Sequence, residues 1–339
     1  EPGAPYKAKT SGDKRRVKEL ADTPATISVL TQSQIKDSGK TDLRDVLAAQ
    51  PGVTLGTGEN GNAFGDRYII RGHEARSDVF VDGLRDPGMT TRESFATEQI
   101  EITKGPSSTF AGRGSTGGAI NSITKQASSE YNFNKVEAGV GTDDYRRITL
   151  DSNQKITDDL AVRVNLLHSY KEIPDRSPAD KERNGIALSS VFQVNDKLEL
   201  TADYYSLSAA DRPDLGTYIV PDGSPVKDIP TYLQKQDFLE SDIETFTFRA
   251  SYQANDKLRI DNSTRYGTTE NGYVVTGARG TVRDATDPVA PGVSTIGLST
   301  HQGWQDVEYF VNQSNVYFDT PLLGMNHQFL FSLEYSDLN

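Results

Sequence analysis

Cysteine is absent from this 339-residue chain, and tryptophan and methionine are scarce, with one and two residues respectively. Without cysteine, a disulfide framework, a thiolate metal site and a thiol nucleophile are all excluded. The chain also lacks any apolar run approaching the roughly 20 residues that a membrane-spanning helix needs. The mean hydropathy of −0.57 fits this exclusion of helical spans. It leaves open a β-barrel, whose alternating strands look only weakly hydrophobic.

Clusters of catalytic or metal-binding side chains are missing as well. The four histidines are scattered. No two of them have the i, i+4 spacing that would place them on one face of a helix, and no acidic ligands are grouped around them. Neither a metal site nor a hydrolytic triad is therefore predicted. Gly112-x-Gly114-x-x-Gly117 matches the letters of a dinucleotide fingerprint, which requires a preceding strand and a following helix. Here a polar turn precedes it and the strand-like run 119–124 follows. We therefore predict no enzyme activity and no cofactor.

Charge divides the chain into two parts. Residues 1–130 contain 17 basic and 17 acidic side chains, whereas residues 131–339 contain 19 basic and 31 acidic ones, so the whole net charge of −12 lies in the second part. An acidic surface argues against a nucleic-acid partner. We predict a flexible N-terminal arm over 1–21, one domain over 22–130 and a different body over 131–339.

The first domain has the pattern of a small α+β unit. Residues 26–30 read as a strand, and Thr31 with Gln34 has the spacing of a helix capping box. A second helix is predicted over 41–47, where the apolar residues share one face. Further strands are predicted over 53–55, 97–102 and 119–124.

Three short apolar runs in this domain each stop at a glycine, at Gly72, Gly83 and Gly105. Glycine is favoured where the backbone needs a positive φ or a close approach, so we expect short strands with crowded turns. Residues 68–71 and 78–81 are expected to pair. The polar loops 56–65 and 84–95 would then fall at the same end of the domain.

From residue 131 onward, apolar and polar residues alternate, as in a half-buried antiparallel sheet. Tight turns alternate with long connections, and residues 193–198 are nearly repeated at 253–258. This alternation is typical of an outer-membrane barrel. Several strands also exceed the about 5–6 residues usual in soluble proteins, which disfavours a jelly roll or adhesin sandwich. We predict nine strands, at about 133–141, 145–154, 160–171, 184–194, 197–208, 243–254, 257–270, 306–319 and 326–337.

Together these features resemble the TonB-dependent outer-membrane transporters, and within them the catecholate-type ferric-siderophore receptors. The resemblance rests on residues 24–30, on Ile70-Arg71-Gly72 and Val81-Asp82-Gly83, and on the glycine-rich run 104–121, in this order and spacing. It implies a plug inside a transmembrane antiparallel β-barrel of 22 strands. Nine strands cannot close, and an open edge is not tolerated in lipid, so we expect the chain to be the first part of a transporter. The family's energy-coupling box is not recognisable before the plug.

The resemblance also implies a ligand. A ferric catecholate is anionic and aromatic, so its capture needs arginines and aromatic rings. Iron would be met only inside that chelate, and no metal site is predicted in the protein itself. The candidate ligand contacts are Arg67, Arg85, Asp86, Arg92, Arg212, Tyr218 and Trp304, with the loop 84–95 facing the chelate.

A second set of residues is expected to build the plug. Four of them, Arg71, Arg113, Glu98 and Glu101, are expected to form ion pairs with the barrel. The full set of candidate structural residues is Arg71, Gly72, Asp82, Gly83, Glu98, Glu101, Gly105, Pro106, Arg113, Gly117 and Gly118.

We therefore predict a monomeric receptor in the outer membrane of a Gram-negative bacterium, surrounded by lipopolysaccharide and other outer-membrane lipid. It would bind a ferric siderophore and import it when TonB pulls on the periplasmic side of the plug. Two alternatives remain open. One is an importer of haem, cobalamin or a saccharide; the other is a non-transporting adhesin or phage-docking protein.

Overall fold

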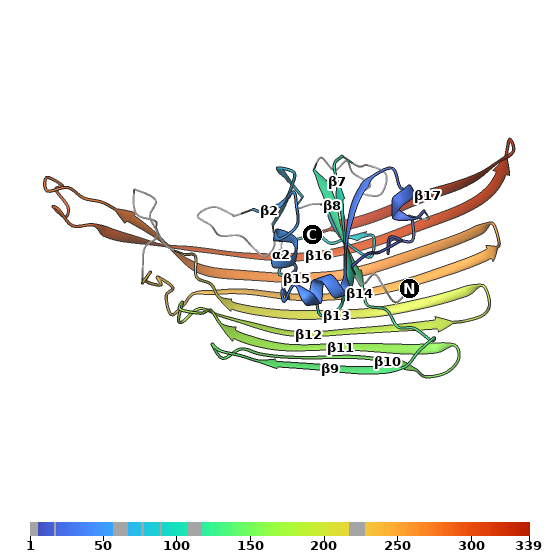
Figure 1. Cartoon of the computed structure of the whole chain (residues 1–339), viewed down its shortest axis with the longest axis horizontal. Helices are drawn as coiled ribbons and strands as arrows, with labels where there is room; N and C mark the ends of the chain where they lie inside the picture. The colour runs from blue at the N-terminus through green and yellow to red at the C-terminus, as the bar shows by residue number, and fades with distance from the viewer. Residues whose placement is uncertain are drawn as a thin grey trace.

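The computed structural model describes residues 6–16, 18–56, 67–75, 78–88, 90–106, 117–216 and 228–339. It contains a small body with helices and strands over residues 20–124, and a large antiparallel sheet over residues 133–338. Figure 1 shows the small body lying against one face of the large sheet. We call this the inner face of the sheet, and the opposite one the far face. Among the described residues, no helix is long and apolar enough to cross a membrane.

The small body is built from short elements. Its strands are arranged in a five-stranded sheet of order β1-β7-β8-β5-β6 and a three-stranded sheet of order β2-β3-β4. The predicted strands over 26–30, 97–102 and 119–124 correspond to β1, β7 and β8. The elements are η1 (Leu20–Asp22), β1 (Thr26–Thr31), α1 (Gln32–Asp37), α2 (Leu43–Ala48), β2 (Val53–Leu55), β3 (Tyr68–Ile70), β4 (His73–Glu74), β5 (Val79–Val81), β6 (Leu84–Arg85), β7 (Thr97–Lys104) and β8 (Gly118–Thr124).

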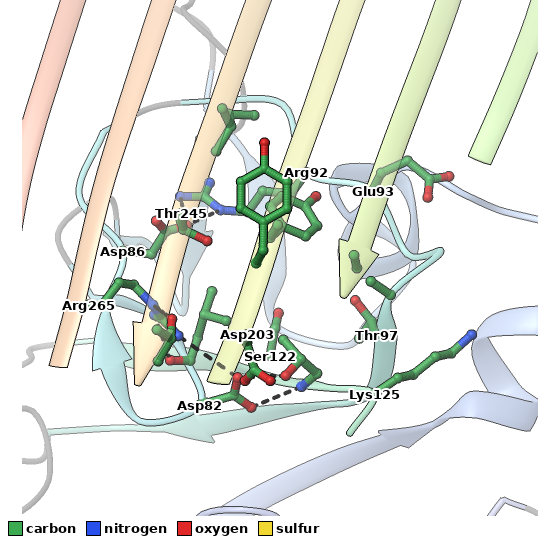
Figure 2. Close-up of a pocket in the computed structure, with 18 of the residues that line it drawn as sticks. Asp82, Asp86, Arg92, Glu93, Thr97, Ser122, Lys125, Asp203, Thr245 and Arg265 are labelled. Atoms are coloured by element: carbon green, nitrogen blue, oxygen red, sulfur yellow. Dashed lines mark hydrogen bonds and ion pairs between the residues drawn. The ribbon is translucent and has the colours of Figure 1, made fainter. Parts of the chain in front are cut away.

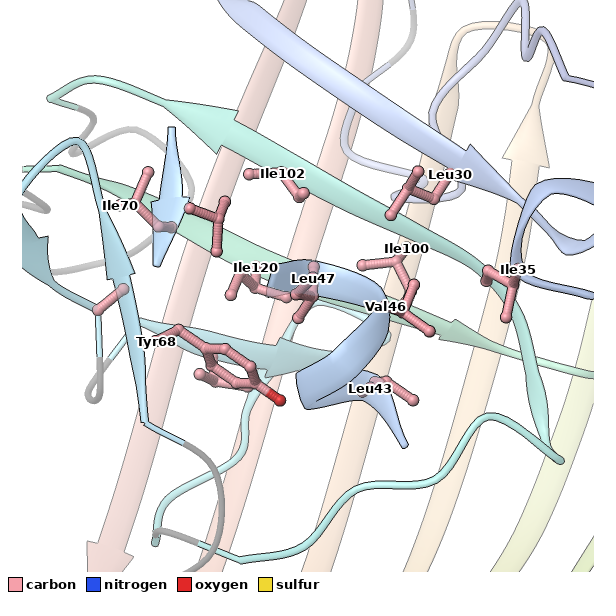
Figure 3. Packing of buried hydrophobic residues seen from close by; sticks show 13 residues of the cluster. Leu30, Ile35, Leu43, Val46, Leu47, Tyr68, Ile70, Ile100, Ile102 and Ile120 are labelled. Atoms are coloured by element: carbon pink, nitrogen blue, oxygen red, sulfur yellow. The ribbon is translucent and has the colours of Figure 1, made fainter. Parts of the chain in front are cut away.

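Both predicted helices are present, and local side chains explain why they form. The Thr31 hydroxyl accepts a hydrogen bond from the Gln34 amide at 3.3 Å, and the Gln34 side chain accepts one from the Thr31 amide at 3.0 Å. This reciprocal capping box starts α1. Helix α2 buries one face against the sheets (Figure 3). The buried core includes Leu43, Val46 and Leu47 of α2 with Tyr68, Ile70, Ile100, Ile102 and Ile120.

Two hairpins in the small body have two-residue turns. Arg71-Gly72 joins β3 to β4, and Asp82-Gly83 joins β5 to β6. All four turn residues have φ between 49° and 80°, which is the type I′ turn that favours glycine at its second position. The predicted pairing of 68–71 with 78–81 is wrong. The turn at Arg71 folds the chain straight back into β4, while β5 pairs in parallel with β8 in the other sheet.

The large sheet has nine strands that follow one another in sequence order, as predicted. Each neighbouring pair is antiparallel. We call its two ends the tight-turn end and the long-connection end. The strands are β9 (Phe133–Val140), β10 (Arg146–Lys155), β11 (Leu160–Glu172), β12 (Asp180–Gln193), β13 (Leu198–Arg212), β14 (Phe238–Asn255), β15 (Leu258–Thr281), β16 (Thr295–Leu322) and β17 (Met325–Leu338).

The sequence repeat marks two turns with the same hydrogen bonds. Asn195 Oδ1 accepts from the amides of Lys197 and Leu198 at 2.9 and 3.0 Å, and Asn255 Oδ1 accepts from the equivalent amides at 2.8 and 3.1 Å. An asparagine that bonds to its own following backbone fixes a tight turn. The repeated residues therefore specify the tight-turn end of β12–β13 and β14–β15.

The predicted strands are too short at the long-connection end. Strand β15 continues to Thr281 and β16 begins at Thr295, so most of the loop predicted over 271–305 is a hairpin. Strand β14 likewise begins at Phe238. The extensions of β15 and β16 contain glycines, such as Gly277, Gly280 and Gly297, which interrupt the apolar alternation by which strands are recognised.

The large sheet exposes apolar side chains on one face and buries polar side chains on the other, which is the opposite of a sheet in a soluble protein. On β14–β16, alternate residues of the far face are exposed aromatics such as Phe246, Tyr266 and Phe310, whereas the inner face buries Thr247 and Arg265. Because side chains alternate along a strand, one face is apolar and the other polar. Apolar residues that face outward, with polar ones inside, are typical of a sheet surrounded by lipid.

The core of the small body can be tested at Leu47, whose side chain is fully buried. We expect Leu47→Ala to lower the free energy of opening of the small body by about 2–5 kcal/mol, because the buried methyl groups are lost and a cavity remains. Native-state hydrogen exchange of the β7 and β8 amides measures this. Arg44→Ala is the control, since Arg44 is exposed on the same helix. Equal exchange in the two variants would contradict this packing.

Candidate functional site

The contact between the small body and the inner face is centred on the Asp82 carboxylate. Asp82 Oδ2 lies 3.2 Å from Arg249 Nη2 and 3.9 Å from Arg265 Nη2. Within the small body, Asp82 accepts hydrogen bonds from the Thr124 amide at 2.9 Å and from the Thr124 hydroxyl at 2.7 Å. Figure 2 shows Arg265 and Asp203 of the sheet lying around Asp82. One turn residue thus joins two strands of the sheet to β8.

These contacts determine the charge state of Asp82. Burial alone would raise its pKa, but the two guanidinium groups and the Thr124 hydrogen bonds outweigh burial and lower the pKa below its usual range. The neighbouring backbone is held as well. Arg265 Nη1 donates to the Val81 carbonyl at 3.0 Å, and Gln313 Nε2 donates to the Gly83 carbonyl at 3.3 Å. The whole 81–83 turn is therefore bound to the sheet.

Two more carboxylates of the small body meet arginines of the inner face. Arg183 Nη2 lies 3.4 Å from Asp42 Oδ2, and Arg147 Nη2 lies 2.8 Å from Glu93 Oε1. The Glu93 side chain is 0% exposed. Burial raises its pKa, and Arg147 offsets this only in part. The acid is supplied by the small body and the base by the sheet in all three contacts.

Sequence reasoning missed this arrangement. Arg147, Arg183, Arg249 and Arg265 all occupy inner-face positions of their strands. In the sequence, Arg249 lies between the apolar residues Phe248 and Ala250, in the polar phase of the alternation. Since the apolar phase faces lipid, the polar phase faces the interior. The alternation therefore indicated the inner face for Arg249, whereas Arg183 lies between Glu182 and Asn184 and has no such signal.

Apolar contacts between the two bodies are few and local. Phe95 stacks on Tyr205 with ring centroids 5.8 Å apart, and it lies so close to β12 that a Cβ on Gly185 would be 2.6 Å from its ring. Leu84 packs against Val307 and neighbouring residues of β16. Among the residues that the structure describes, the interface is thus mainly polar, with two apolar contact points.

The predicted ligand residues are only partly brought together. Asp86 and Arg92 form an ion pair at 3.1 Å, and Tyr309 donates to Asp86 at 3.4 Å. Arg92 is buried, so this part of the loop 84–95 packs against the sheet. Arg85 lies over the Phe80 ring.

The other candidates lie apart from that pair. Arg67 pairs with Glu74 at 2.8 Å, and Arg212 pairs with Asp180 at 2.6 Å. Trp304 is 63% exposed and lies on the far face of β16, in the same phase as Phe310. Tyr218 lies outside the described residues.

The predicted plug residues also have different partners from those expected. Glu101 accepts hydrogen bonds from the Ser11 hydroxyl at 2.7 Å and from the Gly12 amide at 2.5 Å. Glu98 is exposed and forms no ion pair with the residues that the structure describes. Arg71 lies beside Gly105 within the small body. No barrel ion pair is therefore seen for these three in the described ranges, and Arg113 lies outside them.

Close packing explains the glycine pair at the start of β8. A Cβ on Gly117 would lie 2.3 Å from the Ile70 carbonyl oxygen, and one on Gly118 would lie 2.1 Å from the Thr103 carbonyl oxygen. A side chain at either position would collide with backbone. Pro106 is exposed just beyond β7.

The N-terminal segment is docked, in contrast to the flexible arm that was expected. Asp13 and Arg15 are buried and form an ion pair at 2.9 Å. Arg15 Nη2 also donates to the Gly83 carbonyl at 3.3 Å, and Arg259 of β15 donates to the Lys14 carbonyl at 3.4 Å. The segment therefore contacts the same turn that the sheet holds.

A small body bound by ion pairs to the polar inner face of a long-stranded antiparallel sheet defines a class of protein, the plugged membrane barrels. The comparisons with known proteins agree. Residues 19–119 match the model of the TonB-dependent Receptor Plug Domain. The chain belongs to this family, and the small body is its plug.

Two relatives illustrate the family. The chain is 35% identical over 345 residues to the probable TonB-dependent siderophore receptor PiuA of Acinetobacter baumannii, covering 97% of this chain and 45% of the relative. It is 32% identical over 332 residues to the catecholate siderophore receptor Fiu of Escherichia coli K12, covering 92% of this chain and 43% of the relative. The chain thus spans a little under half the length of these relatives.

Solved structures have the same architecture. The crystal structure of PiuA superposes with a TM-score of 0.88 at 32% identity, covering 98% of this chain and 48% of that one. The closed form of the ferric-catecholate import receptor Fiu gives 0.90 at 29% identity, covering 98% and 49%. The predicted fold, a plug with about nine strands of a barrel, is confirmed.

The Asp82 anchor can be tested by an isosteric change. We expect Asp82→Asn to weaken attachment of the plug by about 3 kcal/mol, because two arginines then face a neutral amide. Hydrogen exchange of the β5 and β8 amides in the detergent-solubilised receptor measures this. Asp158→Asn is the control, since that side chain is 93% exposed in a tight turn, and it should change stability by less than about 0.5 kcal/mol. An unchanged exchange rate in Asp82→Asn would refute the anchor.

The two plug carboxylates should respond differently to acid. The lowered pKa of Asp82 means that its contribution to stability is kept down to about pH 3.9, the usual value for aspartate, and is lost only below it. Because its pKa is raised, Glu93 in the folded plug is protonated at a higher pH than in the unfolded chain. Protonation of Glu93 therefore increases the stability of the plug as the pH falls through the raised pKa. pH-difference infrared spectra measure protonation of both carboxyls, with Glu93→Gln and Asp82→Asn assigning the bands. Protonation of Asp82 before Glu93 would contradict both assignments.

Proposed function

We propose that this chain forms the plug and the first barrel strands of an outer-membrane receptor of a Gram-negative bacterium. The receptor would bind a ferric catecholate siderophore and import it with energy from TonB. The observation that carries the proposal is similarity along nearly the whole chain to two proteins named as siderophore receptors. For Fiu, the name specifies catecholate.

The proposed cycle places the ligand and TonB on opposite sides of the plug. The chelate would be captured at the long-connection end of the barrel, and TonB would act on the plug at the tight-turn end. The docked N-terminal segment reaches the Gly83 carbonyl, so a pull on that segment would act on the turn that is also bound to β14 and β15. Ligand entry would then require the contacts of this turn to break.

The composition of the interface supports a plug that moves. Hydrogen bonds and ion pairs with the wall can be exchanged for water at a small net cost, because water replaces each partner. Apolar burial has no such replacement. The wall contacts of Asp42, Asp82 and Glu93 are polar. In the described part of the plug, the apolar contacts are those of Phe95 and Leu84 with their neighbours. A plug bound in this way is firmly seated at rest but can be displaced by a pull.

The surroundings and resident groups of the receptor are part of the same proposal. The exposed aromatic side chains of the far face would contact outer-membrane lipid, including lipopolysaccharide. The receptor would be a monomer without a resident cofactor, and iron would be present only as cargo within the chelate.

Growth under iron limitation tests the function. We expect a strain that lacks its own siderophore receptors, but produces the full receptor, to grow on ferric catecholates and to fail without TonB. Growth only on haem, cobalamin, a saccharide or a ferric hydroxamate would reassign the substrate. We expect a receptor that lacks residues 22–124 to lose TonB-dependent uptake, because the plug on which TonB acts is then missing. Phage or surface binding that survives this deletion, without any uptake by the intact receptor, would favour a docking protein.

A further inference from the structure

Four polar side chains interrupt the apolar far face of the sheet on β15 and β16. They occupy successive far-face positions of these two neighbouring strands, and each is half-buried: Asn262, Thr264, Asn312 and Ser314. We call these four residues the polar patch. Along the strands, the far-face residues that flank the patch are Ile260 and Tyr266 on β15 and Phe310 and Val316 on β16. The patch therefore lies within the apolar band and not at its margin.

The strands on either side of the polar patch do not continue it. On β14 the residues opposite the patch are Phe248 and Ala250, and on β17 they are Leu333 and Tyr335. Phe248, Leu333 and Tyr335 are exposed, so the patch is surrounded by apolar surface. Polar side chains in the membrane-facing part of a protein are costly and mark a functional contact.

The two amides of the polar patch bond to each other. Asn262 Nδ2 donates to Asn312 Oδ1 at 3.2 Å, and Asn312 Nδ2 donates to Asn262 Oδ1 at 3.1 Å. Asn262 Nδ2 also donates to the Ser314 hydroxyl at 2.8 Å, and Asn312 Nδ2 donates to the Thr264 hydroxyl at the same distance. Both protons of each amide nitrogen are therefore used within the patch.

The two hydroxyl groups keep their own protons for a partner outside the protein. Thr264 and Ser314 accept hydrogen bonds from the amides, and neither hydroxyl donates one to a residue that the structure describes. A hydroxyl can do both, and each amide oxygen still has a second lone pair. The hydrocarbon contains no water to complete these bonds, so leaving them unmade is costly. The patch thus offers donors and acceptors to a molecule that lies against it in the bilayer.

The depth of the polar patch indicates which molecule this is. The margin of the apolar band is marked by Tyr204 and Tyr266, whose hydroxyls donate to Glu244 at 2.7 Å and to Glu308 at 3.0 Å, since ionised carboxylates lie at the level of the headgroups. Asn312 lies four residues from Glu308 on β16. At about 3.3 Å per residue and a tilt of about 35–45°, this places Asn312 about 10 Å below the headgroup level. A partner must carry oxygen atoms at this depth, beneath the ester groups of an ordinary phospholipid.

The size of the polar patch favours a lipid over a second protein. A stable interface between proteins takes about 20–30 residues a side, whereas the patch has four and its surroundings have the apolar character of the rest of the far face. One or two acyl chains cover such an area.

We propose that the polar patch is a binding site for the 3-hydroxyacyl chains of lipid A, the lipid part of lipopolysaccharide. These chains carry a hydroxyl or an ester on their third carbon, and so bring oxygen atoms into the hydrocarbon. Those oxygens accept from Thr264 and Ser314, and a chain hydroxyl donates to the amide oxygen of Asn312. Phe248 and Leu333 contact the methylene groups on either side. The identity of the lipid rests on the outer-membrane location in the proposed function, but not on which chelate the receptor imports.

A pair of lipids that differ only in the acyl hydroxyl tests the site. The full receptor in detergent is mixed with equal amounts of two phosphatidylglycerols, one with 3-hydroxymyristoyl chains and one with myristoyl chains. Native mass spectrometry then measures the ratio of the two lipids that stay bound. Because the headgroups are identical, contacts at the headgroup level cancel in this ratio.

We expect the parent receptor to retain the hydroxylated lipid about fivefold better than the other, as two side-chain hydrogen bonds in a membrane allow. Thr264→Val with Ser314→Ala removes the two donors with little change of shape and should bring the ratio close to one. Ser152→Ala with Ser190→Ala is the control. These two hydroxyls also lie on the far face, but they already donate within the sheet, at 2.6 and 3.2 Å, so the control should keep the parental ratio.

The same variants test lipid A in the outer membrane itself. The 3-hydroxy fatty acid that co-purifies with the receptor should fall several-fold in the Thr264/Ser314 variant and stay unchanged in the control. A parental ratio near one, an equal ratio in the two variants or unchanged co-purification would each overturn the lipid site. Receptor pairs that form in the parent and disappear in the Thr264/Ser314 variant, without a lipid preference, would replace the lipid by a second receptor.

Failure of the proposed function is a separate result. A parent receptor that takes up no ferric catecholate, but keeps its preference for the hydroxylated lipid, would overturn the transport proposal and leave the lipid site intact. Uptake at the parental rate together with loss of the preference would do the reverse.

Discussion

A carboxylate buried between the plug and the barrel wall needs a guanidinium group opposite it, and the rest of this structure depends on that constraint. Asp82 can stay ionised away from water only because Arg249 and Arg265 lie beside it and Thr124 bonds to it. The turn that carries Asp82 is fixed by these contacts. The strands on either side of the turn are fixed with it.

The constraint also determines how the plug can move. Its wall contacts are charge pairs and hydrogen bonds, which water can replace, whereas its own core is apolar and closed around Leu47 and Tyr68. The apolar core therefore stabilises the plug itself, whereas water can replace the contacts between the plug and the wall. A force applied through the N-terminal segment would act first on the polar contacts of the 81–83 turn, since both Arg15 and the wall bind this turn.

At three contacts with the wall, the plug supplies the acid and the sheet's inner face supplies the base. At β9–β11 the signs are reversed, because Lys36 and Lys125 on the plug side lie beside acids of the sheet. Ion pairs of both polarities therefore hold the plug against the wall.

The sequence by itself determined the local structure. The capping box at Thr31, the Asp82-Gly83 turn, the repeated asparagine turns and the alternation of the nine strands act over a few residues, so their physics can be read directly. Tertiary structure alone decided which elements meet. β5 pairs with β8 and not with β3, because the turn at Arg71 is complete in itself. Arg92 is buried and Trp304 faces outward, because strand phase and docking place them, and neither effect is local. The partner of Asp82 lies more than 160 residues away on another sheet, and no spacing rule along the chain could have identified it.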